Sequence, residues 1–474
     1  MEMTPSAASA PQPPAASPAS PVVSLLRQLG IVSATALVVS NMIGTGIFTT
    51  TGFLASDLGS AGIIFLIWIA GALCALAGAF CYSELGVNFP SSGGEYVYLT
   101  RAYGPTWGFM TGWISFFAGF SAPIAAAALA FSDYLAFFWP ELKQANSAYS
   151  LDIGFTTLKL GGAQLCASSL IAVFTILNFY GVKLVAAVQN TLTTTKVAVI
   201  LGLIVFGLAI GNGDWAHFSQ PAVRGSTTAL PAQFAISLFF IYVSYSGWNA
   251  ATYVAEELKE PSRTLPIALA LGTALVALLY LGLNVVFIYA VPLEEMKGVI
   301  AVGSLAASKL FGPEVAGIFA LLMAVSLMST VNAMVTIGPR VYYAMAKNGA
   351  FFAAAAKVTE RSHAPVIAIA CQGVVSMLIT MTPFPDLIIY IGFALNFFAM
   401  MTVASLFKFR HQPGWRKLRV VSFAWPLLPL IFFVVGAVAT AVGATLQPRI
   451  ALAAVLTIIS GAAVYHYYLR HKQA

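Results

Sequence analysis

Twelve long apolar runs, separated by short polar breaks, dominate this sequence of 474 residues. A helix needs roughly 20 consecutive apolar residues to cross the hydrocarbon core of a bilayer. Only 8% of the residues are charged, whereas a soluble domain has about 25%. We therefore predict an all-α membrane protein with twelve transmembrane helices, at residues 31–55, 61–87, 105–138, 163–181, 189–211, 232–258, 265–291, 313–346, 364–383, 386–408, 422–444 and 449–468.

The distribution of lysine and arginine predicts how these helices are oriented. An even number of spans puts both termini on one side, and positive charges accumulate on the cytoplasmic side. With both termini cytoplasmic, 16 of the 23 Lys and Arg residues lie on the inner side and six on the outer side. We expect a multi-pass protein of the cell membrane with a single domain at 23–468. Residues 1–22, rich in Pro, Ala and Ser, and 469–474 would be cytoplasmic tails, the first of them disordered.

The side chains in the predicted spans do not suggest catalysis. The four cysteines lie within spans, and the five histidines fall in loops, helix ends or the tail. No cluster of His, Cys, Asp and Glu has the spacing of a metal site, and no Ser, His and acid set converges. The sequence therefore predicts neither an enzyme nor a metal or other cofactor. The net charge of +7 is explained by membrane insertion, so no nucleic-acid partner is predicted.

Two predicted spans carry helix-weakening residues near their midpoints. The first contains "IGTGIF" (43–48) and the sixth contains "SYSGWN" (244–249). Paired interruptions at corresponding places in two halves of a chain indicate a transporter's binding site. Unwound backbone at that depth must line a cavity or bind something. The amides that begin the helix after Gly46 suit a carboxylate and the free carbonyls suit an ammonium, which together match a zwitterionic amino acid. The alternative is that these glycines serve close helix packing.

Several longer motifs resemble the amino acid–polyamine–organocation transporter superfamily, and its L-type amino acid transporter branch most closely. They are "IGTGIF" (43–48), "CYSELGVNFPSSGGEYVYL" (81–99), "YGP" (103–105), "YSGWNAATYVAEELKEPSRTLP" (245–266) and "PRVYYAMAKNGAFF" (339–352). The resemblance implies a LeuT-like fold in which helices 1 and 6 are broken and helices 1 to 10 form a five-plus-five inverted repeat. Repeat one would be about 31–211 and repeat two about 232–408, with two extra C-terminal helices at about 422–468.

The resemblance also implies which residues hold the substrate. The backbone around Gly44, Thr45 and Gly46 would hold the carboxylate, and the carbonyls of Met42, Val243 and Ser246 would hold the amino group. Ile43, Tyr242, Gly247 and Asn249 would belong to the same region. Relatives usually have an aromatic gate residue where this chain has Val243, so a weaker gate is expected unless the neighbouring Tyr242 compensates.

Lys196 lies a couple of turns inside the fifth predicted span. A charge within the bilayer is costly and is a functional candidate by default, although a lysine near a helix end can also extend its stem to the interface. In relatives with the motif "QNxxTxxK", this lysine lies beside helices 1 and 8, where sodium binds in sodium-coupled cousins. The resemblance thus implies sodium-independent transport, with Lys196 as the substitute for the ion.

Other charges are interpreted more simply. Glu84, Glu95 and Arg101, between the second and third spans, are expected to pair and cap helices in the inner loop, with an inner gate as the alternative.

The predicted function is secondary transport of L-amino acids by alternating access, as an exchanger or a proton-coupled carrier. A polyamine or amine carrier and a receptor that binds amino acids without moving them are the alternatives. The outer loop at 139–162 has no cysteine. We therefore expect no disulfide-linked partner and a protein that functions as a monomer.

Overall fold

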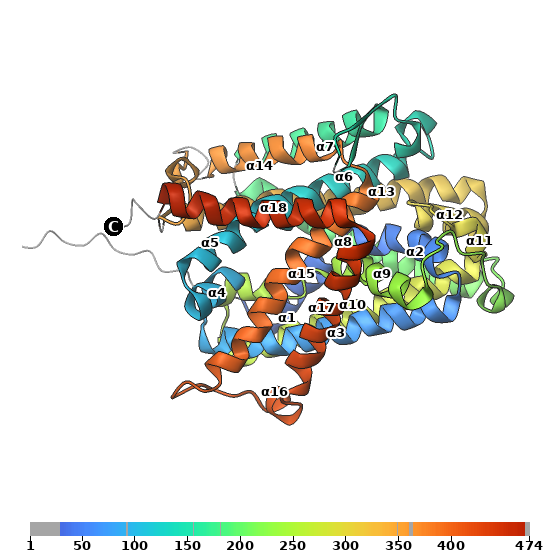
Figure 1. The fold of residues 1–474 in the computed structure, drawn as a ribbon. Coiled ribbons are helices and arrows are strands. Elements are labelled where there is room, and N and C mark those ends of the chain that lie inside the picture. Colours follow the sequence, from blue (N-terminus) through green and yellow to red (C-terminus); the bar gives the residue numbers. More distant parts are fainter. Residues whose placement is uncertain are drawn as a thin grey trace, which may run out of the picture.

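The computed structural model describes residues 29–91, 93–154, 156–180, 182–347, 349–359 and 364–469, most of them helical (Figure 1). The first half contains α1 (Ile31–Met42), α2 (Thr45–Leu58), α3 (Ala61–Asn88), α4 (Glu95–Tyr103), α5 (Pro105–Ile114), the π-helix η1 (Ser115–Ser121), α6 (Ala122–Leu135), the 3-10 helices η2 (Pro140–Leu142) and η3 (Gln144–Asn146), β1 (Tyr149–Asp152), β2 (Thr157–Leu160), α7 (Gly162–Phe179) and α8 (Val182–Ile210). The second half contains the 3-10 helix η4 (Trp215–Ser219), α9 (Leu230–Tyr245), the 3-10 helix η5 (Ala250–Glu257), α10 (Pro261–Ala290), α11 (Leu293–Met296), α12 (Val302–Phe311), α13 (Pro313–Lys347), the 3-10 helix η6 (Ala353–Ala356), α14 (Val366–Ile379), α15 (Phe384–Phe409), α16 (Arg419–Phe423), α17 (Leu427–Leu446), α18 (Pro448–Val464) and the π-helix η7 (Tyr465–Leu469).

Every one of the twelve predicted ranges contains helix, but not all of these helices are long enough to span a membrane. The described residues contain ten helices that are long and apolar enough, and α1 and α2 form an eleventh candidate that is bent by 42°. The range 364–383 holds only α14, of 14 residues. Pro365 directly precedes α14, and the prolines at 383 and 385 follow it closely, so the helix cannot extend far in either direction. The predicted tail at 1–22, and residues 470–474, lie outside the described residues.

Prolines set the starts of several of the long helices. Pro105, Pro261 and Pro448 are the first residues of α5, α10 and α18. The first position of a helix has no intrahelical partner for its N–H, so a proline there loses nothing and brings a helical φ. Gly104, just before α5, has a φ of 101°, a conformation that glycine adopts readily. These local signals explain why the ends of the helices follow the polar breaks of the sequence.

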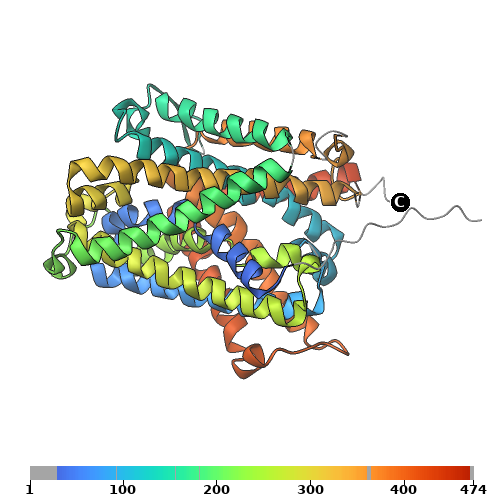
Figure 2. The ribbon, with the colours of Figure 1, turned by 180° about the vertical axis from the view of Figure 1, so that it is seen from behind.

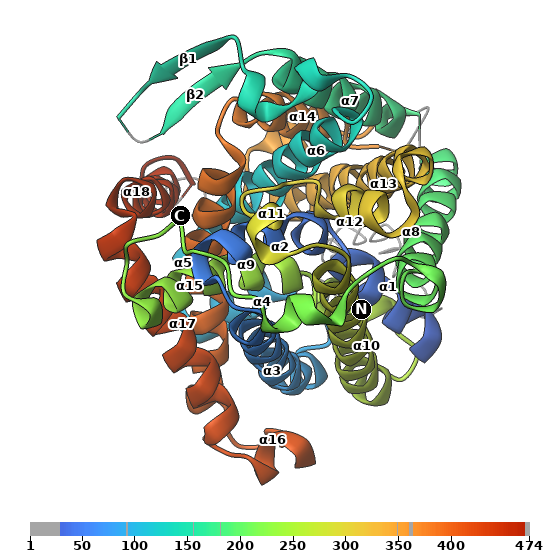
Figure 3. The same ribbon diagram turned by 90° about the vertical axis from the view of Figure 1, so that its right-hand side faces the viewer.

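The helices form one bundle around a shared apolar core. Figure 3 looks along the bundle and shows α2 and α9 near its middle. In Figure 2, α8 crosses the face formed by α10 and α13, which it contacts. On another side, α7 and α14 run next to each other (Figure 1). The antiparallel hairpin β1–β2, with Tyr149 opposite Leu160, projects from the periphery. The fold therefore encloses the interrupted segments in the interior.

Candidate functional site

The first interruption separates α1 from α2. Met42 ends α1 and Thr45 begins α2, and the two residues between them have extended backbone angles, with φ and ψ of −71° and 91° at Ile43 and −124° and −154° at Gly44. The N–H of Ile43 still bonds to the carbonyl of Val39. The first amides of α2 have no preceding helical turn, so they form a helix N-terminus inside the bundle. The sequence predicted this break at the position where it occurs.

The second interruption separates α9 from η5. Tyr245 ends α9, and Ser246 has an extended ψ of 150°. Gly247 has a φ of 97°, and a Cβ atom there would lie 2.7 Å from the carbonyl oxygen of Asn41. Only glycine meets both conditions. The chain re-enters a helical conformation at Ala250, as a 3-10 helix.

The two interruptions lie against each other. A Cβ atom at Gly46 would lie 2.3 Å from the Cα of Ser244, and the hydroxyl of Ser244 is 3.0 Å from that of Thr50. Close packing, the alternative that the sequence left open, therefore applies to Gly46 and Gly247. Gly44 differs, because its Cβ would have only van der Waals neighbours, the nearest being Cγ2 of Thr330 at 3.7 Å. The half-buried Gly44 thus has space beside it.

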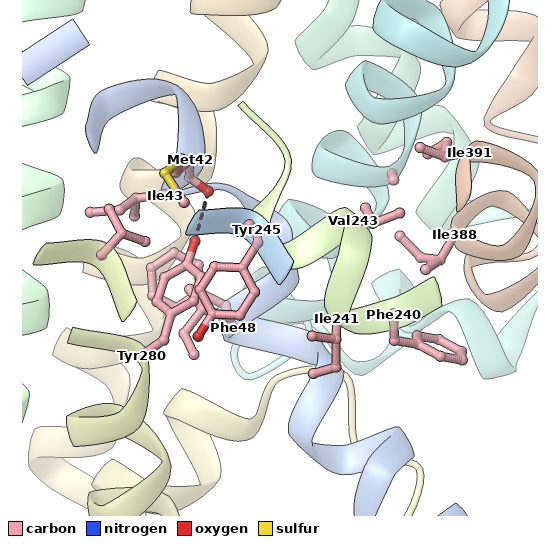
Figure 4. Packing of buried hydrophobic residues seen from close by; sticks show 14 of the residues in the cluster. Met42, Ile43, Phe48, Phe240, Ile241, Val243, Tyr245, Tyr280, Ile388 and Ile391 are labelled. Atoms are coloured by element: carbon pink, nitrogen blue, oxygen red, sulfur yellow. Dashed lines mark hydrogen bonds between the residues drawn. The ribbon is translucent and has the colours of Figure 1, made fainter. Parts of the chain in front are cut away.

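A buried tyrosine that the sequence analysis did not single out joins the two interruptions. The hydroxyl of Tyr280, on α10, donates to the carbonyl of Met42 at 2.7 Å (Figure 4) and lies 3.1 Å from the carbonyl of Ser244. Its ring packs edge-to-face on Trp68, with centroids 5.5 Å apart. Nothing in the apolar run around Tyr280 distinguishes it from an ordinary core residue, so only the fold could reveal this role.

The carbonyls expected to bind an ammonium already accept hydrogen bonds from the protein. Besides Met42, the carbonyl of Val243 accepts from both the N–H and the hydroxyl of Ser246, at 3.1 and 2.7 Å. A carbonyl oxygen has two lone pairs, so the Met42 oxygen can accept a second bond. The prediction that unwinding leaves the carbonyls unpaired is therefore wrong for Met42 and Val243 in this conformation, because Tyr280 and Ser246 donate to them.

Lys196 reaches the first interruption from α8. Its Nζ donates to the carbonyl of Ile43 at 2.6 Å and to the hydroxyl of Thr330, on α13, at 3.1 Å, and the side chain is fully buried. The stem does not extend to an interface, so the snorkelling alternative is wrong. Among the described residues, Lys196 has no ion pair with a carboxylate. Within the part of the chain that the structure describes, Nζ of Lys196 is thus held against the broken backbone by two neutral oxygens.

The residues at the expected gate position point away from the first interruption. Val243 is buried and lies near Ile388 and Ile391 of α15 (Figure 4). Tyr242 lines a small cavity of about 40 Å³ between α3, α9, α15 and α17, to which none of residues 42–47 contributes. The idea that Tyr242 replaces an aromatic gate over the first interruption gains no support from this placement.

Asn249 belongs to a polar cluster beyond the second interruption. Its Nδ2 donates to Oε1 of Glu95 and to the hydroxyl of Tyr253, both at 3.2 Å, and the hydroxyl of Tyr82 donates to the same Glu95 oxygen at 2.6 Å. Burial raises the pKa of the Glu95 carboxyl above its usual value. The side chain of Glu95 thus links α4 to the unwound segment through Asn249. This contact agrees with the inner-gate alternative.

Known proteins are similar to this chain over most of its length. A family model described as amino acid permease matches residues 29–460. The large neutral amino acids transporter small subunit 2 of Oryctolagus cuniculus is 30% identical over 422 residues, which cover 87% of this chain and 75% of that protein. The b(0,+)-type amino acid transporter 1 of Mus musculus is 27% identical over 457 residues, which cover 95% of this chain and 89% of that protein. The chain therefore belongs to the amino acid permease family, in the L-type branch of the amino acid–polyamine–organocation superfamily that its motifs resembled.

Proposed function

We propose that this protein is a sodium-independent secondary transporter of L-amino acids that works by alternating access. The observation that carries the proposal is the bond from Nζ of Lys196 to the carbonyl of Ile43, within the interrupted segment. A protein cation there supplies the positive charge that a bound metal ion would otherwise bring. The names of both relatives, each of which is an amino acid transporter, agree with this proposal.

The substrate would bind where the two interruptions meet. Its carboxylate would accept hydrogen bonds from the amides at the start of α2, around Gly44, Thr45 and Gly46, which the helix dipole also favours. Its amino group would lie near the carbonyls of Met42 and Ser246. The space beside Gly44 supports this placement, because the backbone there is open to a small group. A polyamine is disfavoured, since the cationic Lys196 lies at the same interruption.

We further propose the topology implied by the family. Helices 1 to 10 would form the five-plus-five inverted repeat, with α1 and α2 as one broken span, α9 and η5 as another, and α14 as a short ninth span. Two C-terminal helices, α17 and α18, would complete twelve spans and leave both termini in the cytoplasm, as the lysine and arginine distribution favours.

The protein would work without a disulfide-linked partner. The word "subunit" in the name of the Oryctolagus cuniculus relative says that this relative assembles with another chain. In the present sequence the outer loop at 139–162, which carries the β1–β2 hairpin, has no cysteine. A covalent link through that loop is therefore impossible, and we propose that the monomer transports.

The test is uptake into proteoliposomes preloaded with different amino acids, with and without a sodium or pH gradient. We expect uptake that does not require sodium and that is stimulated by some internal amino acids or by a proton gradient. Absence of uptake and exchange by correctly folded protein would overturn transport in favour of the receptor alternative. A strict sodium requirement would overturn the role of Lys196.

A matched pair of variants tests the substrate pose. Gly44→Ala adds a methyl group that meets only van der Waals neighbours, so binding should fall slightly. Gly44→Val fills the space next to the α2 amides, so binding should be abolished while membrane insertion is unchanged. Unaltered affinity in Gly44→Val would contradict the carboxylate assignment.

A further inference from the structure

A second, larger cavity lies apart from the interrupted segments. It has a volume of about 320 Å³ and lies between the ends of α2, α9, α15 and α17 and the segment that precedes α9. Leu446, one of its lining residues, is 37% exposed, so the cavity reaches the surface. The proposed topology puts this end of the bundle on the outer side of the membrane. Five polar side chains line it: Asp57, Ser226, Thr228, Gln233 and Gln447.

Aromatic rings separate this cavity from the substrate site. Phe53 of α2 stacks on Phe240 of α9, with ring centroids 5.4 Å apart, and on Phe384 of α15, at 5.9 Å. Phe53 and Phe240 also line the cavity. The hydrogen bond between Thr50 and Ser244 lies about one helical turn further along the same two helices, toward the interruptions. The aromatic rings of Phe53, Phe240 and Phe384, which we call the aromatic floor, therefore lie between the cavity and the interruptions.

The cavity contains one carboxylate, that of Asp57, and this group has no ion-pair partner among the described residues. The hydroxyl of Ser237 lies 3.4 Å from its Oδ2, and the side chain of Gln233 also hydrogen-bonds to this carboxyl group. The guanidinium of Arg224 is close enough to attract the carboxylate but binds backbone carbonyls, that of Asp57 at 2.9 Å and that of Thr228 at 2.6 Å. The carboxylate thus lines the cavity with neutral hydrogen-bond partners and with no ion pair among the described residues.

We propose that this cavity is an outer subsite that captures the ammonium group of an incoming amino acid before the aromatic floor opens. Asp57 would be the counter-ion, Gln233 would hold the Asp57 carboxylate in place, Gln447 would supply a neutral amide oxygen, and Phe53 and Phe240 would contact the apolar part of the solute. The volume lies within the range of small-molecule sites, about 300–1,000 Å³, and far exceeds the roughly 30 Å³ of one water molecule. This inference rests on the proposed transport function, which it deepens by naming the entry step.

Two sources can supply the ammonium group: the α-amino group that all amino acids share, or a cationic side chain. The test measures entry into right-side-out membrane vesicles for a neutral amino acid, leucine, and a cationic one, lysine. The variant is Asp57→Asn, which removes the charge and keeps the size. The control is Glu314→Gln, at an exposed carboxylate in the first turn of α13.

We expect the external KM of Asp57→Asn to rise about tenfold, the loss typical of a charge-assisted hydrogen bond, with the kcat for influx unchanged. A rise for both substrates assigns the α-ammonium group, and a rise for lysine alone assigns the side chain. An unchanged external KM in a wild-type-like transporter would overturn the subsite alone, as would an equal rise in Glu314→Gln. Absence of transport by the wild-type protein would instead overturn the proposed function, and the subsite with it.

Discussion

Two buried basic side chains, Arg410 and Lys196, are held in opposite ways. Arg410, directly after α15, makes two hydrogen bonds of 2.6 Å to the carboxylate of Glu84 on α3, and its guanidinium lies 4.0 Å from the ring centroid of Trp425. The same carboxylate also accepts from Nε1 of Trp415 at 2.9 Å. Among the described residues, the hydrogen-bond partners of Lys196 are one carbonyl and one hydroxyl.

The difference indicates which region is fixed and which can rearrange. A bidentate arginine–carboxylate pair with its oxygens satisfied is costly to separate, so it ties α3 to α15 in one geometry. A lysine bound by neutral oxygens at a helix break loses less when its partners shift. We therefore expect the Glu84–Arg410 contact to stay fixed during transport, and rearrangement to occur around Lys196. The sequence-based view of Glu84 as an inner-loop charge is wrong, because the residue is fully buried in the last turns of α3.

Breaking the Arg410 pair should have the largest effect. Glu84→Ala leaves a buried guanidinium without its carboxylate, which should lower the free energy of unfolding by about 3–5 kcal/mol. Thermal unfolding in detergent measures this. Glu84→Gln keeps an acceptor for Trp415 and should be less harmful. If Glu84→Ala unfolds at the same temperature as the wild type, the Glu84–Arg410 pair is not costly to separate, and the contrast with Lys196 fails.

Removing the other cation should impair transport and leave stability nearly intact. Lys196→Met keeps a similar apolar stem but loses both hydrogen bonds to the interruption, so uptake should fall at least about tenfold. The matched control is Lys309→Met, at an exposed lysine paired with Glu295, which should transport normally. Normal uptake kinetics in Lys196→Met would show that the lysine is only a packing element.

A smaller effect is expected where Tyr280 bridges the interruptions. Tyr280→Phe removes only the hydroxyl that donates to the carbonyls of Met42 and Ser244. The substrate-binding free energy should weaken by about 1 kcal/mol, which is roughly a fivefold weaker affinity. Tyr390→Phe removes a hydroxyl that contacts Thr457 on α18, far along the chain from both interruptions, and serves as the control. If both variants bind substrate equally well, Tyr280 does not position the site.

The smallest effect should come from Glu95, and it should depend on pH. Because burial raises its pKa in the folded protein, the wild type should lose stability as pH rises from about 4.3, the value in an unfolded chain, through the folded pKa. Glu95→Gln lacks this titration, so its melting temperature should exceed that of the wild type by a degree or so at pH 8 and match it at pH 4. If Glu95→Gln instead melts below the wild type at pH 8 and matches it at pH 4, the pKa of Glu95 is not raised in the folded protein.

The sequence by itself determined the class of the fold, the family and the positions of the two interruptions. Apolar runs of about 20 residues predict helices, because the bilayer demands an internally satisfied backbone. The range 31–55 contains the bend between α1 and α2, and the range 232–258 contains the end of α9 and the start of η5. Gly247 could be singled out because glycine weakens a helix wherever it occurs, but its close approach to the Asn41 carbonyl could not be predicted. The match to the amino acid permease model confirms the family that the motifs predicted.

Only the tertiary structure decided which side chains meet. Tyr280 reaches Met42 across 238 positions of sequence, and Arg410 reaches Glu84 across 326. The cavity lined by Asp57 likewise forms only where the ends of four helices and one loop come together. No local pattern encodes such encounters, because they depend on how whole helices pack. That is also why the hydrogen bonds to the carbonyls of Met42 and Ile43 could not be predicted: their donors, Tyr280 and Lys196, come from helices distant in the sequence.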